Sequence, residues 1–513
     1  MKRMRLQVVM WMLLAAAPVW AAAPTTQPQV AFDRWYTVLL GGRPAGWSHT
    51  RVELQAGRFT TTDQMKILIN RGTATLAIGA RSRFVETQSG RPIKAESVSR
   101  MGPQESGQRY VFTDKGIEVT SWQGDQRHTS LAPNPTGAGA HWLPPVAEHR
   151  AVQRQVAAGA RQISTWSLDP SLGPSPTRTD YRLEGRQNVA VLGKVVPAMV
   201  WQETNSHLPG LTTTDYTDEA GWSIKTTIDL LPGMRLEVVQ SDRELALRQI
   251  SPSQVPELMT QTFIKPDKPV PDARQSRLAI YDLTFTPAQG AVAGHPLPAG
   301  LLPTTGCQRV VWSDEYHARV VVNLDSPTAA GSDLPTPADR RPSLMIDSDD
   351  GRVLALRDQA LRGLAADASP VQKAKTLRRF VYRFIRNKDL SIGMATAGET
   401  ARSAEGDCTE HAVLLAALLR AAGIPSRTVS GLLYVDEFLG QKQVFGYHMW
   451  TQAWLDTGQG AHWVDLDAVL PHHAFDAAHI ALGVSSMDDQ SGAMGGDVLD
   501  LLPVLGRLSI AVR

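Results

Sequence analysis

The chain has 513 residues, of which 42% are hydrophobic, so it is long and apolar enough to form several packed domains rather than one. Its 52 lysine and arginine residues nearly balance its 50 aspartate and glutamate residues. This balance gives no excess of basic residues for binding nucleic acid or anionic lipid, so we expect neither as a partner.

The first residues have the pattern of a secretory signal peptide. Lys2, Arg3 and Arg5 precede an apolar run over 8–20, and three alanines then stand before a proline. We therefore predict a signal peptide over 1–23 and a periplasmic or secreted protein with no membrane span after cleavage. The apolar run is too short for a comfortable transmembrane helix, and an uncleaved N-terminal anchor is the alternative.

Residues 24–250 have the pattern of an antiparallel β-rich region. Short segments of β-branched and aromatic residues alternate with turns such as Gly41-Gly42, and no long helical periodicity competes with them. The strand-like segments include 35–40, 64–70, 108–113 and 117–122. A break near 133–180, which begins with a Pro- and Gly-rich run, divides the region into two candidate sub-blocks. We expect either a sandwich or a broad curved sheet.

Three further segments follow along the chain. Residues 251–275 are Pro-rich and are predicted to be a linker, and 276–345 contain two strand-like runs that predict a small β module. The last segment, 346–513, begins with helical patterns and continues with strand patterns. We therefore predict an α+β fold, in which a large all-β region precedes a C-terminal domain built from helices and an antiparallel sheet.

The stretch EGDCTEHAVLLAALLRAAGIPSR, residues 405–427, places Cys408 at the start of an amphipathic helix. Asp407 suits the N-cap position and Glu410 follows three residues later, so the pair predicts a capping box. A helix start stabilises a thiolate through its free N–H groups and its dipole, which makes Cys408 a candidate nucleophile. The alternative is that Cys408 is a small core residue, because free cysteine is often buried.

A thiol nucleophile needs a base and a group that orients the base. In GYHMWTQAW, strand alternation puts His448 on one face with Trp450 and Gln452. In WVDLDAV, Asp465 and Asp467 share a face of the next strand, where either could stand beside the histidine. Taken singly, His448 would be a structural histidine and Asp467 a turn or cap residue, so the prediction depends on their combination.

Four motifs follow one another in the last third of the chain: Gly406-Asp407-Cys408, then RAAGIPSR over 420–427, then His448-Met449-Trp450, and then Trp463 with Asp467. Together they resemble the transglutaminase-like superfamily. The resemblance implies a papain-like core with a helix-borne cysteine packed on the antiparallel sheet. In it Cys408 is the nucleophile, His448 the general base and acid, and Asp467 the group that orients the imidazole.

The chain departs from the family pattern at two places. The family usually has proline and threonine after its aspartate, whereas this chain has Ala468 and Val469, so Asp465 remains the alternative to Asp467. The backbone N–H of Cys408 would supply one oxyanion donor. The family often adds an indole or phenol donor from the preceding loop, but no aromatic residue lies between Leu390 and Cys408, so the second donor is unassigned.

The resemblance implies an exported thiol enzyme that acts on amide bonds of a protein or peptide substrate through an acyl-enzyme. Amide hydrolysis and transglutaminase-type acyl transfer share that intermediate, and the likeness to the short bacterial form of the motif favours hydrolysis. The alternative is a non-catalytic binding or scaffolding protein of the cell envelope with a vestigial thiol core, which the size of the β-rich region favours. The sequence gives no indication of oligomeric state.

We expect no cofactor and no metal ion, because His411 and the pair His472-His473 lack the spacing of known metal-ligand motifs. Cys307 and Cys408 are the chain's two cysteines. In an exported protein they could form a disulfide, which would block the Cys408 thiol by oxidation. A single disulfide, however, would constrain only a small part of a chain of this length.

Overall fold

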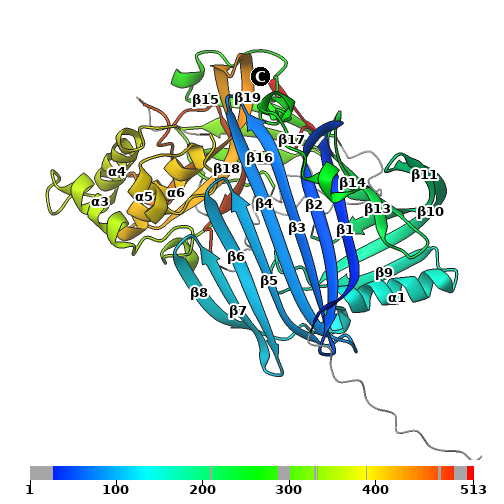
Figure 1. Ribbon diagram of the computed structural model, residues 1–513. Coiled ribbons are helices and arrows are strands. Elements are labelled where there is room, and N and C mark those ends of the chain that lie inside the picture. The colour runs from blue at the N-terminus through cyan, green and yellow to red at the C-terminus, as the bar shows by residue number, and fades with distance from the viewer. Residues whose placement is uncertain are drawn as a thin grey trace, which may run out of the picture.

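The structure, a computed structural model, describes residues 27–207, 211–286, 301–328, 331, 333–388, 390–471, 475–489 and 505–513. The predicted signal peptide and the pair His472-His473 lie outside the described residues. The fold is α+β, as predicted, with an all-β N-terminal region followed by a region of helices and smaller sheets (Figure 1). None of the helices within the described ranges has the length and apolar character that crossing a membrane requires.

Within the described residues, fourteen strands of the N-terminal region form one antiparallel sheet. Strands β8 to β1 lie side by side in sequence order, β1 pairs with β14, and β14 to β9 continue to the other edge. The halves meet where Trp35 of β1 stands opposite Ser241 of β14, so the two predicted sub-blocks are halves of a single sheet. The strands are β1 (Gln29–Leu40), β2 (Arg43–Gln55), β3 (Arg58–Arg71), β4 (Ala74–Thr87), β5 (Pro92–Met101), β6 (Gln104–Thr113), β7 (Gly116–Gln123), β8 (Gln126–Ala132), β9 (Gln162–Ser167), β10 (Thr177–Val191), β11 (Lys194–Asn205), β12 (Thr212–Thr217), β13 (Ser223–Leu231) and β14 (Met234–Ser241).

Helix α1 (Pro145–Ala157) follows the short helix η1 (Gly137–His141) in the break between β8 and β9, where the sequence pattern predicted no helix. The first turn of α1 is capped from outside, because the Glu86 carboxylate of β4 accepts the N–H groups of Val146 and Ala147 at 2.9 and 3.1 Å. Val146 is buried beside Phe32 of β1. The prediction was wrong here because the cap lies some sixty residues away in sequence and the helix buries little apolar surface.

The segment between the large sheet and the next one turns repeatedly and buries Val255, Ile264 and Val270. It contains the short helices α2 (Arg243–Ala246), η2 (Pro252–Gln254), η3 (Thr260–Thr262) and η4 (Ala273–Gln275). A second sheet follows in the order β16-β17-β15-β22, so that a strand from the C-terminal end completes it. Its strands are β15 (Leu278–Phe285), β16 (Gln308–Trp312), β17 (His317–Asn323) and β22 (Leu508–Val512), and η5 (Pro337–Asp339) comes after β17.

The C-terminal region places one buried helix, α6, against a third sheet in the order β20-β19-β18-β21. The residues of α6 from Ala412 to Leu419 are at most 2% exposed, because α3, α4 and α5 cover the side of α6 that the sheet does not. The elements are α3 (Gly351–Leu361), α4 (Pro370–Phe384), α5 (Ala397–Ser403), α6 (Cys408–Ala421), β18 (Ser426–Phe438), β19 (Gln441–Asp456), β20 (Ala461–Leu466) and β21 (His479–Ser485).

The second and third sheets share a hydrophobic core. Tyr281 of β15 and Val320 of β17 belong to the same buried cluster as Leu432 of β18 and Phe445 of β19. The preceding segment joins this core through Ile264, which exchanges two backbone hydrogen bonds with Phe445 at 2.9 and 2.8 Å. The third sheet therefore packs against α6 on one face and against the second sheet on the other.

One end of the large sheet rests on the loop that leads into α6 (Figure 1). Arg71, at the end of β3, donates to the carbonyl oxygens of residues 390 and 392 at 3.1 and 3.3 Å. Gln123, at the end of β7, donates to the carbonyl of Met394 at 2.8 Å, and Asp125 in the next turn pairs with Arg402 at 3.2 Å. We call these the hairpin contacts: residues 71, 123 and 125 against 390–402.

Candidate active site

The start of α6 has the capping box that the sequence predicted. The Asp407 carboxylate accepts the N–H of Thr409 at 2.9 Å, and the Glu410 carboxylate accepts the N–H groups of Asp407 and Ala395 at 2.9 and 3.0 Å. Gly406 precedes the box with φ of 146°, and a Cβ there would lie 2.3 Å from that of Glu410. Glycine is therefore required at this turn, and Cys408 begins the helix.

The Cys408 thiol is partly buried, and its surroundings raise its pKa above the ordinary value. Burial is the largest cause, and the charges of Asp407 and Glu410 add to it, while the Met449 backbone N–H and Arg71 oppose it. The sequence argument considered the helix start alone and expected a stabilised thiolate. The structure adds acidic neighbours and desolvation, so the resting group is a neutral thiol.

The two cysteines are free thiols, which contradicts the alternative of a disulfide between them. Cys307 is buried beneath the third sheet, where its backbone N–H donates to Asp465 at 3.2 Å. Burial and the neighbouring Asp465 carboxylate raise the pKa of the Cys307 thiol well above its ordinary value. Cys307 is thus a core residue held far from the thiolate state.

His448 of β19 is paired with Asp467, which follows β20. Its Nε2 lies 2.9 Å from Oδ2 of Asp467, and the Asp467 side chain is fully buried. Burial by itself would raise the pKa of this carboxyl, but the paired histidines His448 and His479 outweigh it and lower the pKa. Asp467 is therefore an ionised acceptor that fixes the imidazole.

Asp465, the alternative, lies farther along the strand and contacts other side chains of β19. It accepts hydrogen bonds from the Trp450 indole at 2.9 Å and from the Gln452 amide at 2.8 Å. Its second oxygen accepts the backbone N–H of Cys307. The structure thus brings Asp467, and not Asp465, to His448.

A second histidine, missed by the sequence reasoning, also contacts Asp467. His479 at the start of β21 places Nε2 3.3 Å from Asp467 and Nδ1 3.0 Å from Asp476. Burial by itself would lower its pKa, but hydrogen bonds to the two carboxylates raise it to about 9. His479 is therefore protonated at neutral pH, and the pattern Asp476-x-x-His479 before a strand was the signal available in the sequence.

The three side chains His448, Asp467 and His479 have ligand-type atoms within 4.8 Å of one another. Two imidazoles and a carboxylate match the chemistry of a transition-metal site. Here, however, each of these atoms already serves the hydrogen-bonded relay, and a protonated His479 has no lone pair for a metal ion. The donor set therefore fits a proton relay better than a metal centre.

Cys408 and His448 line one cavity of about 540 Å³. Because Nε2 of His448 is taken by Asp467, Nδ1 is the nitrogen that can exchange a proton with the thiol. Arg71 of the large sheet and Met259 and Phe263 of the following segment complete the walls, so the cavity is not built by the C-terminal region alone. The other lining residues are apolar, basic and acidic: Arg274, Lys388, Leu390, Asp407, His411, Leu433, Val435, Asp436, Glu437, Phe438, Gly446, Tyr447, Val469 and Leu470.

Two polar groups that line this cavity have no hydrogen-bond partner among the described residues: Nε2 of His411 and the hydroxyl of Tyr447. Nδ1 of His411 lies 2.6 Å from the Asp407 carbonyl and must donate to it, and burial lowers the His411 pKa to about 4. Nε2 therefore carries a lone pair and is an acceptor. Burial raises the pKa of Tyr447, so its phenol keeps its proton and is a donor. Sequence reasoning searched for such a donor only in the loop before Cys408.

Comparison with known proteins supports the family predicted from the motifs. Residues 358–468, which include Cys408, His448 and Asp467, match the sequence model of the transglutaminase-like superfamily. The predicted resemblance is therefore confirmed over these residues. No curated protein matches the chain.

Three solved structures are similar to parts of the chain at low identity. A β-barrel-like protein of a domain of unknown function from Brucella abortus is 11% identical over 43% of this chain and 98% of its own, with a TM-score of 0.31. A candidate cysteine protease from Cytophaga hutchinsonii is 14% identical over 45% of this chain and 84% of its own, with a TM-score of 0.27. The periplasmic domain of TgpA from Pseudomonas aeruginosa, bound to ethylmercury, is 16% identical over 38% of this chain and 90% of its own, with a TM-score of 0.23.

Proposed function

We propose that the chain is an exported thiol enzyme that acts on amide bonds of a protein or peptide substrate. Cys408 is the nucleophile, His448 the general base and acid, and Asp467 the group that orients His448. The observation that carries the proposal is the cavity that Cys408 and His448 share, together with the 2.9 Å contact between His448 and Asp467. The match of 358–468 to the transglutaminase-like superfamily supports the same chemistry.

The reaction begins from a neutral thiol. As Sγ of Cys408 attacks the carbonyl carbon of the amide, the thiol proton moves to Nδ1 of His448, so no free thiolate accumulates. The negative oxygen of the tetrahedral intermediate lies at the start of α6, where the Cys408 N–H can stabilise it. The carbon–nitrogen bond then breaks, His448 returns its proton to the leaving amine, and a thioester remains on Cys408.

The second half of the reaction regenerates the thiol. Water, or an amine, attacks the thioester carbon while His448 takes a proton from the attacking group and returns it to sulfur. Water yields a carboxylic acid and an amine yields a new amide. The largely apolar walls fit a peptide segment with apolar side chains.

One observation favours a second function, a non-catalytic envelope protein with a vestigial thiol core. The raised pKa of Cys408 is the direction expected of an inert buried thiol. The two functions differ in the pH dependence of alkylation. A nucleophile assisted by His448 reacts with iodoacetamide below the pH at which an unassisted thiol ionises, and His448→Ala abolishes this reaction.

The enzyme proposal is tested by amide turnover and acyl transfer. Purified protein is incubated with a library of fluorogenic peptide amides and, separately, with dimethylcasein and monodansylcadaverine. We expect Cys408→Ala and His448→Ala to abolish the activity found, and Cys307→Ala to retain it, because Cys307 lies in the core. Amide turnover that persists in Cys408→Ala contradicts the proposal.

We also propose that the mature protein is periplasmic or secreted after removal of residues 1–23. The basic, apolar and small-residue pattern at the N-terminus supports this location. N-terminal sequencing of protein from the periplasmic and culture fractions tests it, with a first residue near Pro24 expected. Recovery of the chain with Met1 intact in the cytoplasmic fraction contradicts it.

A further inference from the structure

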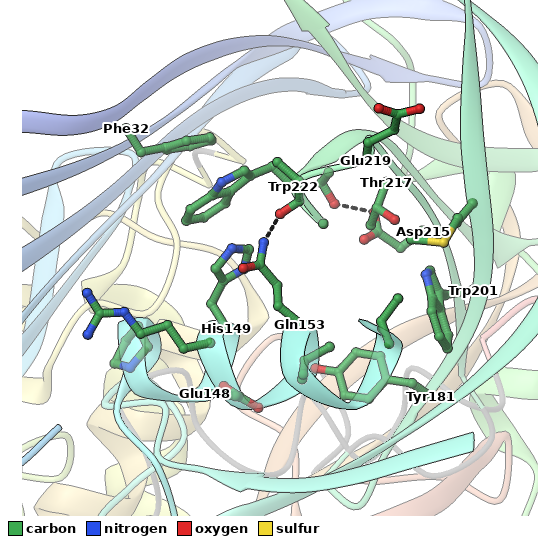
Figure 2. Close-up of a pocket in the computed structure, with 18 of the residues that line it drawn as sticks. Phe32, Glu148, His149, Gln153, Tyr181, Trp201, Asp215, Thr217, Glu219 and Trp222 are labelled. Carbon is green, nitrogen blue, oxygen red and sulfur yellow. Dashed lines mark hydrogen bonds between the residues drawn. The ribbon is translucent and has the colours of Figure 1, made fainter. Parts of the chain in front are cut away.

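The large sheet holds a cavity of its own, of about 880 Å³, that shares no residue with the thiol cavity (Figure 2). It lies between α1 and the strands on both sides of the junction of β1 with β14. Its volume falls within the roughly 300–1,000 Å³ that small-molecule sites occupy. Nothing in the thiol chemistry requires this cavity.

Aromatic rings form two of its sides. The Trp222 ring stacks on Phe32, with centroids 3.9 Å apart, and on His149 of α1, at 3.7 Å. Trp201 and Tyr181 lie across the cavity from this stack in Figure 2. These faces offer apolar contact and the negative potential of π-systems.

Besides the exposed Glu219, three carboxyl groups line the cavity from separate elements: Glu148 of α1, Glu203 of β11 and Asp215 of β12. Two of them have hydroxyl donors, because Thr165 donates to Glu148 at 2.6 Å and Thr226 donates to Asp215 at 2.8 Å. The side chain of Glu203 has no recorded hydrogen bond or ion pair with any described residue, and burial together with the other two carboxyls raises its pKa well above the ordinary value.

Positive charge is absent from the interior of this cavity, as far as the described residues show. The two arginines among the lining residues, Arg150 and Arg154, are exposed on α1. Arg150 is engaged elsewhere, with its guanidinium 4.7 Å from the Phe59 ring and donating to the Gln88 carbonyl at 3.2 Å. Acidic groups enclosed by apolar walls with no internal cation cost free energy.

A second polar group in the cavity lacks a partner. Thr217 of β12 is only 7% exposed, and its hydroxyl has no hydrogen-bond partner among the described residues. Figure 2 shows it beside Asp215 on the wall of the cavity. A buried hydroxyl without a partner costs free energy, which a ligand with a hydrogen-bonding group would recover.

We propose that this cavity binds a small organic cation, with an ammonium or guanidinium group carried on an apolar body. The charged group pairs with Glu203 and Asp215, the Thr217 hydroxyl supplies a further hydrogen bond, and the apolar body packs on Trp222 and Trp201. A bare metal ion fits less well. Among the described residues, the one trio of His, Cys, Asp and Glu side chains close enough to hold a metal is the relay at His448, not these acids.

The test uses the full mature chain and three probes of equal length: octylamine, octan-1-ol and sodium octanoate. Each is titrated below its aggregation limit, and binding is followed by calorimetry and by the change in tryptophan fluorescence. We expect octylamine to bind at least about tenfold more tightly than octan-1-ol, because one charge-assisted hydrogen bond is worth about that factor. Octanoate is expected to bind most weakly.

Two near-isosteric variants assign the contacts. Glu203→Gln is expected to weaken octylamine binding about tenfold and to leave octan-1-ol binding unchanged, and Thr217→Val to weaken octylamine binding about threefold. Thr217→Val is also expected to raise the melting temperature of the empty protein, because it removes a buried hydroxyl without a partner. Glu118→Gln, on the exposed face of β7, is the matched control and should change neither binding nor melting.

The preference of the unaltered protein for octylamine needs no variant, so the test stands even if one fails to fold. Equal binding of octylamine and octan-1-ol overturns the proposal, as does unchanged octylamine affinity in Glu203→Gln. Calcium chloride that binds stoichiometrically and loses affinity in Glu203→Gln also overturns it, in favour of a metal site.

Discussion

The ion pair between Arg71 and Asp407 joins the large sheet to the start of α6, and its removal is a direct test of that junction. The Arg71 guanidinium lies 2.6 Å from the Asp407 carboxylate, and the two side chains are 21% and 7% exposed. Arg71→Met keeps the length of the side chain and removes its charge. Breaking a buried pair from one side costs about 3–5 kcal/mol, because the other charge stays buried.

We expect the lower end of that range, about 3 kcal/mol, since Asp407 keeps its hydrogen bond from Thr409 and Arg71 is partly exposed. Asp407→Asn removes the stranded charge, so the double variant should recover about 2 kcal/mol relative to the sum of the single variants. Urea denaturation followed by tryptophan fluorescence measures all four free energies of unfolding. Arg71 also opposes the raised pKa of Cys408, so Arg71→Met should slow alkylation of the thiol by iodoacetamide.

The matched control is Arg81→Met, one strand away on β4. Arg81 pairs with Glu96 at 3.2 Å, but its side chain is 54% exposed, and surface pairs of this kind contribute between about 0 and 1 kcal/mol. The reasoning is refuted if Arg71→Met is no more destabilising than Arg81→Met. It is also refuted if the effects of Arg71→Met and Asp407→Asn simply add.

Three further predictions concern the relay and the turn before the thiol. His479 has a folded pKa of about 9 against 6.5 when unfolded, so its stabilisation is complete below about pH 6.5 and is lost as pH rises through 9. The difference in free energy of unfolding between the unaltered protein and His479→Gln should therefore fall by about 3 kcal/mol over that interval, and a flat difference contradicts this. Asp467→Asn should reduce the rate of thiol alkylation at pH 7 about tenfold or more. Asp465→Asn should lower the melting temperature and leave the alkylation rate unchanged. Equal effects of the two variants on alkylation would argue against the assignment of Asp467. Gly406→Ala should lower the free energy of unfolding, measured by urea denaturation, by about 2 kcal/mol more than Gly423→Ala. Both glycines have positive φ, but only at Gly406 would an added Cβ contact another residue. Similar losses in the two variants would exclude that clash.

Sequence reasoning succeeded where the signals are local. The Asp407 and Glu410 capping box and the face of β19 shared by His448, Trp450 and Gln452 follow from patterns a few residues long. The predicted amphipathic character of α6 was wrong, because neighbouring helices and the sheet bury it on all sides. The choice between Asp465 and Asp467 was not local, because both lie on one face of the strand. The register between strands decided it: Asp465 stands opposite Gln452, which leaves Asp467 diagonal to His448.

What the sequence did not predict depends on distant partners. Helix α1 is capped by Glu86, and His479 meets Asp467 only once β21 pairs with β18. The direction of the Cys408 pKa was wrong for the same reason, because the helix dipole is local whereas burial comes from the packing of the whole site. Propensity and periodicity contain no information on such contacts.

The pair of Arg71 with Asp407 makes the thiol cavity depend on a distant part of the chain. Arg71 and Asp407 are 336 residues apart in sequence, so their pair joins the large sheet to the C-terminal region. A nascent or truncated chain that contains Cys408 but lacks a folded sheet has an incomplete cavity wall and an unpaired acid beside the thiol. We therefore expect the reactivity of Cys408 to depend on the folding of the large sheet, and excising the C-terminal region for separate study would remove Arg71 from the cavity wall.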